Sequence, residues 1–232
     1  MATIHRRTDK LPVGALLASV GGFLDAYTLT RHGVFANLQS GNVVLFCVQI
    51  TSWHWRTAAL RLVPVGAFIV GTLAVELLGT PRVVTLVHRP IRLVLTIQIV
   101  LLTVLAVLPG KAPAPVTTVT VAFVAALQFS TFTTLHGAPY ATLMTTGNLR
   151  QCVVAVHRWL TRRDPGSALR AKLYGVVVSA FSGGALTGVI CTRLFGAPAI
   201  AVAAGLLVVA LALLIRESRQ VERAAGEEAA ST

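Results

Sequence analysis

GGFLDAYTLTRHG (Gly21–Gly33) is matched in the second half of the chain by AALQFSTFTTLHG (Ala125–Gly137). Each stretch ends in His-Gly, and each is followed by a Gly-Asn pair, within SGN (Ser40–Asn42) and TGN (Thr146–Asn148). Self-similarity of this kind is typical of a duplicated structural unit. The order of these motifs therefore predicts that the fold is built from two related halves.

A second match extends the duplication. VGAFIVGTLA (Val65–Ala74) aligns with VSAFSGGALT (Val178–Thr187) without a gap. We expect a first membrane repeat over 12–109, a Pro-rich connector over 110–115 and a second membrane repeat over 116–215. A basic tail over 1–11 precedes the repeats, and a polar tail over 216–232 follows them.

Long apolar runs fill both repeats. A helix that crosses about 30 Å of hydrocarbon needs about 20 predominantly apolar residues. Two runs, Val34–Thr51 and Ala138–His157, are weaker because they contain the Gly-Asn pairs and other polar residues. Six runs are clear candidates for membrane spans: Pro12–Thr30, Ala58–Gly79, Ile91–Leu108, Val116–Leu135, Leu173–Thr192 and Ala197–Ile215.

The composition also indicates a membrane protein. Hydrophobic residues make up 55% of the 232 residues and charged residues only 12%, with a mean hydropathy of +0.75. A soluble domain carries about 25% charged residues. So few charges cannot coat a globule in water, which excludes a soluble enzyme, a disordered tail and a disulfide-rich secreted module.

The net charge of +12 comes from basic residues between the apolar runs. Cytoplasmic loops of membrane proteins carry an excess of Lys and Arg beside an anionic leaflet. We therefore expect contacts with anionic lipids rather than nucleic acid, in a multi-pass protein of the inner (plasma) membrane with a cytoplasmic N-terminus. The basic cluster on the predicted cytoplasmic side consists of Arg158, Arg162, Arg163, Arg170 and Lys172.

The Gly-Asn pairs leave two topologies open. If the two weaker runs are broken or re-entrant, three helices of each half span the membrane and the halves have inverted orientation. If both runs cross fully, eight helices span it and the halves are parallel. The distribution of Lys and Arg between the two sides of the membrane is the same in both topologies, so it does not choose between them. We favour an all-α integral membrane protein with six transmembrane helices and two broken or re-entrant segments, because Gly-Asn beside Ser or Thr is a poor helix centre.

The same motifs carry a family resemblance. GGFLDAYTLTRHGVFANLQSGN (Gly21–Asn42) and the second-half ALQ and TTGNL segments resemble the signature of the YoaK-like family of uncharacterised bacterial membrane proteins. The first motif has Ser-Gly-Asn where the family usually has Thr-Gly-Asn, which keeps the hydroxyl group. The resemblance covers nearly the whole membrane region. It implies a small multi-pass inner-membrane protein and brings no activity with it.

Asp25 lies well inside the first predicted span. A charged side chain at a helix centre costs about 2.5–3.5 kcal/mol on insertion scales, so it needs a partner or a water-filled cavity. It either binds a cation, a proton or a substrate amine, or it is a structural hydrogen-bond acceptor or the partner of Arg150. Gln128 lies one position from the matching place in the second half, so the halves differ chemically.

The Gly-Asn pairs provide the second candidate site. We expect Asn42 and Asn148 to cap the helices after them, whose first N–H groups lack partners and whose dipole ends are positive. Two such ends near mid-membrane form an anion or carbonyl site; alternatively, the breaks only pack against each other. The predicted substrate-binding residues are Asp25, Gln39, Ser40, Gly41, Asn42, Gln128, Thr145, Thr146, Gly147, Asn148 and Arg150.

Small residues and cysteines are interpreted structurally. Gly14, Ala18 and Gly22 recur every four residues, as do Ala180, Gly184 and Gly188, a spacing that allows close helix contact. The cysteines, which lie in apolar runs without metal-ligand spacing and predict neither a disulfide nor a metal site, are Cys47, Cys152 and Cys191.

These features favour a transport function. The sequence has no HExxH, no Gly-x-Ser-x-Gly and no phosphate-cradling loop, so we expect neither an enzyme nor a cofactor. We predict a secondary transporter or channel-like permease for a small solute, and the paired helix starts are compatible with an anionic one. A non-transporting membrane scaffold or sensor is the alternative. A homo-oligomer is compatible with either.

Overall fold

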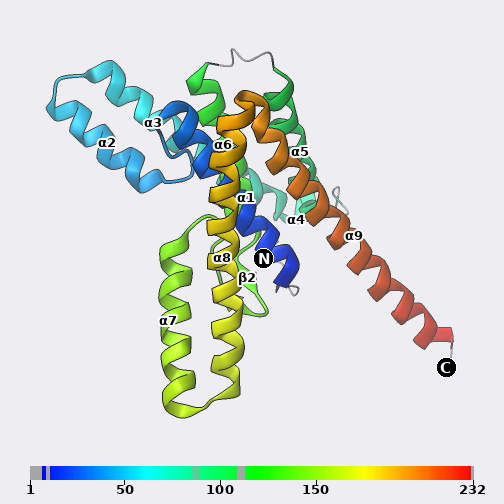
Figure 1. The fold of residues 1–232 in the computed structure, drawn as a ribbon. Coiled ribbons are helices and arrows are strands. Elements are labelled where there is room, and N and C mark those ends of the chain that lie inside the picture. The colour runs from blue at the N-terminus through cyan, green and yellow to red at the C-terminus, as the bar shows by residue number, and fades with distance from the viewer. Residues whose placement is uncertain (1–6, 9–10, 86, 88, 109–112, 231–232) are drawn as a thin grey trace.

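The computed structural model describes residues 7–8, 11–85, 87, 89–108 and 113–230 (Figure 1). Most of the predicted tail over 1–11 and the first half of the predicted connector, 110–112, lie outside the described residues, whereas 114–115 begin α6. Within this part of the chain, one small sheet is formed by three strands: β1 (Arg7–Thr8), β2 (Thr134–Leu135) and β3 (Ala138–Pro139). The helices are α1 (Leu11–His32), α2 (Gln39–Thr51), α3 (Trp55–Leu78), α4 (Pro81–Val84), α5 (Pro90–Val107), α6 (Ala114–Thr131), α7 (Thr145–Arg162), α8 (Pro165–Phe195), the 3₁₀ turn η1 (Ala197–Ile200) and α9 (Ala201–Ala230).

Six segments of the described chain are long and apolar enough to cross a membrane: α1, α3, α5, α6, α8 and Ala197–Gln220, which joins η1 to most of α9. The prediction of an essentially all-helical multi-pass membrane protein with six candidate spans is confirmed. α2 has 13 residues, so its length of about 20 Å is too short for the hydrocarbon core. α7 carries Arg150, Arg158 and Arg162 and is not among the six.

The Gly-Asn pairs do not interrupt a helix. α2 begins at Gln39 and α7 at Thr145, so both pairs lie at the start of a helix. The N-cap residues are Leu38 and Met144, and neither makes a side-chain cap hydrogen bond. The prediction that Asn42 and Asn148 cap helices beginning after them is therefore wrong. Their amides are instead engaged with the loops that precede the two helices.

α8 and α9 extend beyond the predicted spans. α8 begins at Pro165 rather than Leu173, because the Asp164 carboxylate caps it by accepting hydrogen bonds from the N–H groups of Gly166 (3.1 Å) and Ser167 (2.9 Å). α9 continues through most of the predicted polar tail, since Ala, Glu and Arg are good helix formers. The 31 residues of α8 reach about 46 Å, which is longer than the hydrocarbon core.

α1 is the most buried of the six candidate spans, and 13 of its 22 residues are buried. It packs most extensively against α8. Gly22 lies against the carbonyl oxygen of Phe181, and Gly184 lies against the carbonyl oxygen of Ser19, so neither position has room for a methyl group. The predicted close contact through small residues is confirmed.

The packing of α1 on α8 has a counterpart between two other long helices. α3 packs against α6, where Gly71 lies against Phe123 and Ala126. α2 packs along α3, and α7 along α8 (Figure 1). The first helix of each half, α1 or α6, thus packs against the third helix of the other half, α8 or α3. α5 packs against α9.

α1 and α6 run in opposite directions. β1, before α1, pairs with β2, after α6, and Gln128 near the end of α6 donates a hydrogen bond to the carbonyl of Leu17 near the start of α1 (2.9 Å). β2 and β3 form a hairpin around His136 and Gly137, whose φ values of 49° and 74° suit a two-residue turn. The start of α1, the end of α6 and this hairpin therefore lie at one end of the bundle.

Candidate functional site

Asp25 lies in the interior of α1, only 6% exposed. Its carboxylate accepts a hydrogen bond from the backbone N–H of Asn37. Oδ1 has no hydrogen-bond partner within the described structure. Most buried polar atoms in proteins are hydrogen-bonded, so an unpartnered carboxylate oxygen in a membrane span marks a site that needs an explanation.

Gly21, close to the middle of α1, is the point where two loops meet. The side-chain amide of Asn37, in the loop before α2, donates to the Gly21 carbonyl (3.3 Å). Thr142 and Leu143, in the loop before α7, pack against Gly21 on the side where other residues carry a side chain. A Cβ at Gly21 would meet the Thr142 carbonyl oxygen. The loops that precede α2 and α7 therefore both reach the middle of α1.

Asp25 lies on the same face as Gly21. Helical residues four apart are stacked one above the other, and their side chains point toward the helix N-terminus. The Asp25 carboxyl group is thus directed back toward Gly21, where Asn37 and Thr142 also lie. We refer to Asp25, Asn37 and Thr142 as the Gly21 cluster.

The Gly21 cluster contains unsatisfied polar atoms. Asp25 Oδ1, Asn37 Oδ1 and Thr142 Oγ1 are buried and have no hydrogen-bond partner among the described residues. All three side chains are at most 7% exposed. Two of these atoms are acceptors only, and the hydroxyl can accept or donate. The cluster is therefore suited to a proton, a cation or a ligand group that donates hydrogen bonds.

The two Gly-Asn asparagines hold the loops in place. Asn42 donates to the carbonyl of Phe35 (3.5 Å) and Asn148 to the carbonyl of Ala141 (2.6 Å), in each case seven residues back along the chain. Asn148 also accepts from the Ala141 N–H (3.2 Å). The same residue type thus makes the same contact at the start of α2 and of α7. These contacts position the loops that form the Gly21 cluster.

The remaining predicted residues lie around these two helix starts. Gln39 joins the first of them, donating to the Ala36 carbonyl (2.8 Å) and accepting from Asn42 (3.1 Å). Arg150 is exposed on α7, and the described residues contain no ion pair between it and Asp25. Gly41 and Thr145 are half-buried, whereas Ser40, Thr146 and Gly147 are exposed.

Gln128 is buried in α6 but does not join the Gly21 cluster. Its hydrogen bond to Leu17 places its amide about 12 Å along α1 from Asp25, given the rise of a helix. Its Oε1 atom has no partner among the residues described. The structure therefore brings Gln128 to the central helix, at a different level.

Sequence reasoning missed several buried polar groups. Gln98 in α5 is fully buried, and neither atom of its amide has a hydrogen-bond partner in the described chain. The sequence does contain a signal for this residue, because Gln98 is a polar residue within the apolar run Ile91–Leu108. Asn37 was a polar residue in a weaker run, but nothing in the sequence distinguished it from its neighbours. Thr142 becomes part of the Gly21 cluster only through the path of its loop.

Comparison with protein families gives one result. A family described as "Protein of unknown function (DUF1275)" matches residues 13–213. The chain belongs to this family. DUF1275 corresponds to the YoaK-like membrane proteins, so the resemblance drawn from Gly21–Asn42 is confirmed. The DUF1275 match covers all six candidate spans except the ends of the first and last. Curated proteins and solved structures provided no match.

Proposed function

We propose that this DUF1275 protein is a secondary transporter or channel-like permease for a small solute, and that the Gly21 cluster lies on its path. The observation that carries the proposal is the unpartnered, buried Oδ1 of Asp25 in the central span. Ionisable residues inside membrane spans are costly, and they mark ion pathways, proton relays and ligand sites. The cluster oxygens favour a proton, a cation or a solute N–H or O–H group.

We further propose that the two halves are an inverted repeat with re-entrant segments. The reciprocal packing of α1 on α8 and α6 on α3 supports this, as does the opposite direction of α1 and α6. In this arrangement the loops before α2 and α7 enter the membrane from opposite sides and meet at Gly21. Each loop then continues as a helix, α2 or α7, which returns to the side of the membrane from which its loop entered. Transporters with inverted repeats bind their substrate at such a midplane junction.

We infer that the N-terminus and the α7–α8 turn face the cytoplasm of an inner-membrane protein. The basic cluster concentrates positive charge at this turn; its residues are Arg158, Arg162, Arg163, Arg170 and Lys172. Cytoplasmic loops carry such an excess, and anionic lipids attract it. The proposed partners are therefore anionic lipids and a small solute.

Proton and sodium flux test the proposed path. We expect proteoliposomes containing the protein to dissipate an imposed proton or Na⁺ gradient, and Asp25→Asn to reduce the rate to that of empty liposomes. Glu76→Gln is the matched control because Glu76 is an exposed acid in α3, and it should keep the rate. Thr142→Val removes a second polar group of the cluster and should lower the rate without removing charge.

The scaffold alternative makes different predictions. It requires no flux of either ion in the wild-type protein, together with loss of folding in Asp25→Asn. A folded Asp25→Asn protein with the wild-type rate would contradict the proposed role of Asp25. Size-exclusion profiles of each variant distinguish loss of flux from loss of folding.

A further inference from the structure

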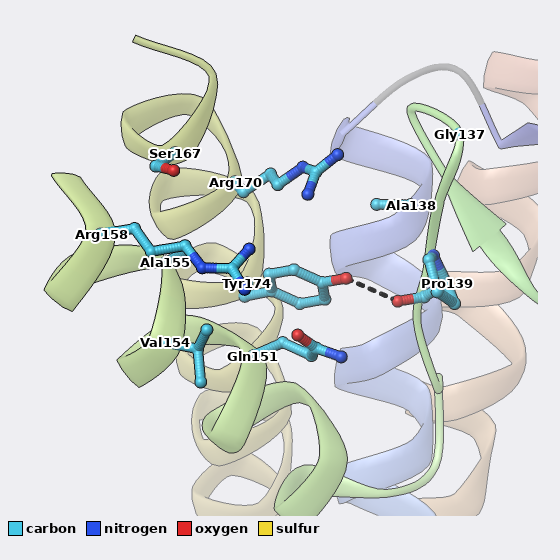
Figure 2. Close-up of a pocket in the computed structure, with 10 residues that line it drawn as sticks. All are labelled: Gly137, Ala138, Pro139, Gln151, Val154, Ala155, Arg158, Ser167, Arg170 and Tyr174. Carbon is cyan, nitrogen blue, oxygen red and sulfur yellow. Dashed lines mark hydrogen bonds between the residues drawn. The ribbon is translucent and has the colours of Figure 1, made fainter. Parts of the chain in front are cut away.

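A pocket of about 230 Å³ lies between α7, α8 and the β2–β3 hairpin. Gln151 and Arg158 line it from α7, and Arg170 and Tyr174 line it from α8. The segment Gly137–Pro139 forms the opposite wall. Figure 2 shows that these four side chains extend from the two helices toward that segment.

Tyr174 fixes this wall. Its side chain is only 5% exposed, and its hydroxyl donates a 2.7 Å hydrogen bond to the Pro139 carbonyl (Figure 2). This bond ties the hairpin to α8 and so fixes one wall of the pocket against another.

The two arginines are available to a ligand. Neither guanidinium makes a hydrogen bond within the described residues, and the pocket lining contains no acid. The acid nearest in sequence, Asp164, attracts Arg170, but its carboxylate is already engaged at the start of α8. It accepts from the Ser167 hydroxyl (2.6 Å) as well as from the two N–H groups that it caps.

We propose that this pocket binds a phosphate group. Arginine is suited to phosphate because its planar guanidinium donates two parallel hydrogen bonds and always keeps its charge. Arg158 and Arg170 come from different helices, and the Gln151 amide adds a further donor. The volume is below the roughly 300–1,000 Å³ of sites for drug-sized ligands, so it fits a small anion or the head of a larger molecule.

Two sources can supply this phosphate group. The pocket lies at the end of the bundle that carries the basic cluster, and basic pockets between helices on the cytoplasmic side bind lipid head groups. A soluble phosphate compound presents the same chemistry. The pocket is separate from the Gly21 cluster, so the proposal does not depend on transport.

Thermal unfolding of the purified full chain in neutral detergent tests the proposal. One arm titrates inorganic phosphate against chloride at equal ionic strength; the other compares short-chain phosphatidylglycerol with phosphatidylcholine. A ligand that binds the native state raises Tm by mass action. We expect Arg158→Gln and Arg170→Gln each to weaken the apparent Kd by at least about tenfold. Lys172→Gln is the matched control, because Lys172 is an exposed cation of α8 outside the pocket lining.

The outcomes separate the sources. Stabilisation by phosphate that is lost in the arginine variants and kept in Lys172→Gln supports the site with a soluble ligand. The same pattern with phosphatidylglycerol alone supports it with a lipid head group. If neither probe stabilises the wild-type protein, or all variants respond equally, the proposal is overturned.

Charge-preserving variants keep the proposal testable if the glutamine variants fail to fold. Arg158→Lys and Arg170→Lys keep the positive charge but lose the planar fork. Each should weaken binding of the effective probe by roughly tenfold, whereas unchanged affinity would show that only the charge of the surface is recognised and would overturn the proposal.

Discussion

Gly21 shows how a residue without a side chain shapes a polar site. The absence of a Cβ lets the Thr142 carbonyl approach α1, while its own carbonyl oxygen accepts from Asn37. Asp25 lies one turn further along the same face. The same lack of a side chain at Gly22 and Gly184 lets α1 and α8 approach closely. The small residues of α1 therefore serve both helix packing and the approach of the loops.

Adjacent glycines of α8 allow a matched test of this packing. Gly184→Ala places a methyl group against the backbone of Ser19 and should destabilise the protein by about 1–3 kcal/mol through overpacking. Gly183→Ala is the control, because a Cβ there meets no atom within 4 Å and alanine favours helix by about 1 kcal/mol. Chemical unfolding in detergent measures both. Equal stability of the two variants would contradict the assigned contact.

The start of α8 depends on one carboxylate. Arg163 ends α7 in the left-handed conformation (φ 52°), and Asp164 then caps α8. This two-residue connection sets α7 beside α8, and it brings Arg158 and Arg170 to the two sides of one pocket. The short connection between α7 and α8 therefore helps to form the proposed phosphate site.

The Asp164 cap predicts a dependence of stability on pH. The hydroxyl of Ser167, followed by the N–H of Gly166, lowers the pKa of the Asp164 carboxyl below its ordinary value of 3.8. A lowered folded pKa means that the cap contributes fully above the unfolded pKa, and that its contribution is lost as the pH falls through the folded pKa. Asp164→Ala should lower Tm at pH 7.

Asp164→Asn is the control for charge, because asparagine also caps helices but does not titrate. The difference in Tm between wild type and Asp164→Asn should shrink as the pH is lowered from 5 toward 3. A difference that stays constant over this range would show that Asp164 does not titrate with the predicted effect on stability.

At the scale of the whole molecule, two loops from the two halves meet at the middle of α1. The reciprocal helix pairing places the α2–α3 pair and the α7–α8 pair in different parts of the bundle (Figure 1). In the proposed arrangement α2 does not cross the membrane, so the turn after it lies on the side of the membrane opposite the α7–α8 turn. The membrane sides of these two turns therefore distinguish six spans from eight.

Cysteine accessibility tests that arrangement. In a background where Cys47, Cys152 and Cys191 are replaced by serine, Ser52→Cys and Gly166→Cys report on the two turns. Six spans predict that a membrane-impermeant maleimide labels Ser52→Cys from the outside of intact cells and Gly166→Cys only after permeabilisation. Eight spans place both turns inside, so protection of both in intact cells would contradict the inverted arrangement.

Much of the fold was predictable because it follows from local composition. The six apolar runs became six candidate spans, and the small-residue spacing became the contact of α1 with α8. The helix starts were predicted less well. Asn42 and Asn148 were expected to cap helices, but they bond to carbonyls seven residues back, a contact that depends on the path of each loop.

The sequence by itself determined that this is a helical membrane protein, and that Asp25 is a costly charge in its first span, because apolar run length and charge are local properties. Only the tertiary structure decided which polar groups gather near Asp25. The Asn37 N–H bonds to the Asp25 carboxylate and Thr142 packs on Gly21, one turn away along α1, because two loops from different halves converge there. The pocket of Arg158 and Arg170 likewise exists only once α7 folds along α8. Contacts between distant segments depend on how helices pack, and that packing is specified by the whole chain rather than by any one stretch.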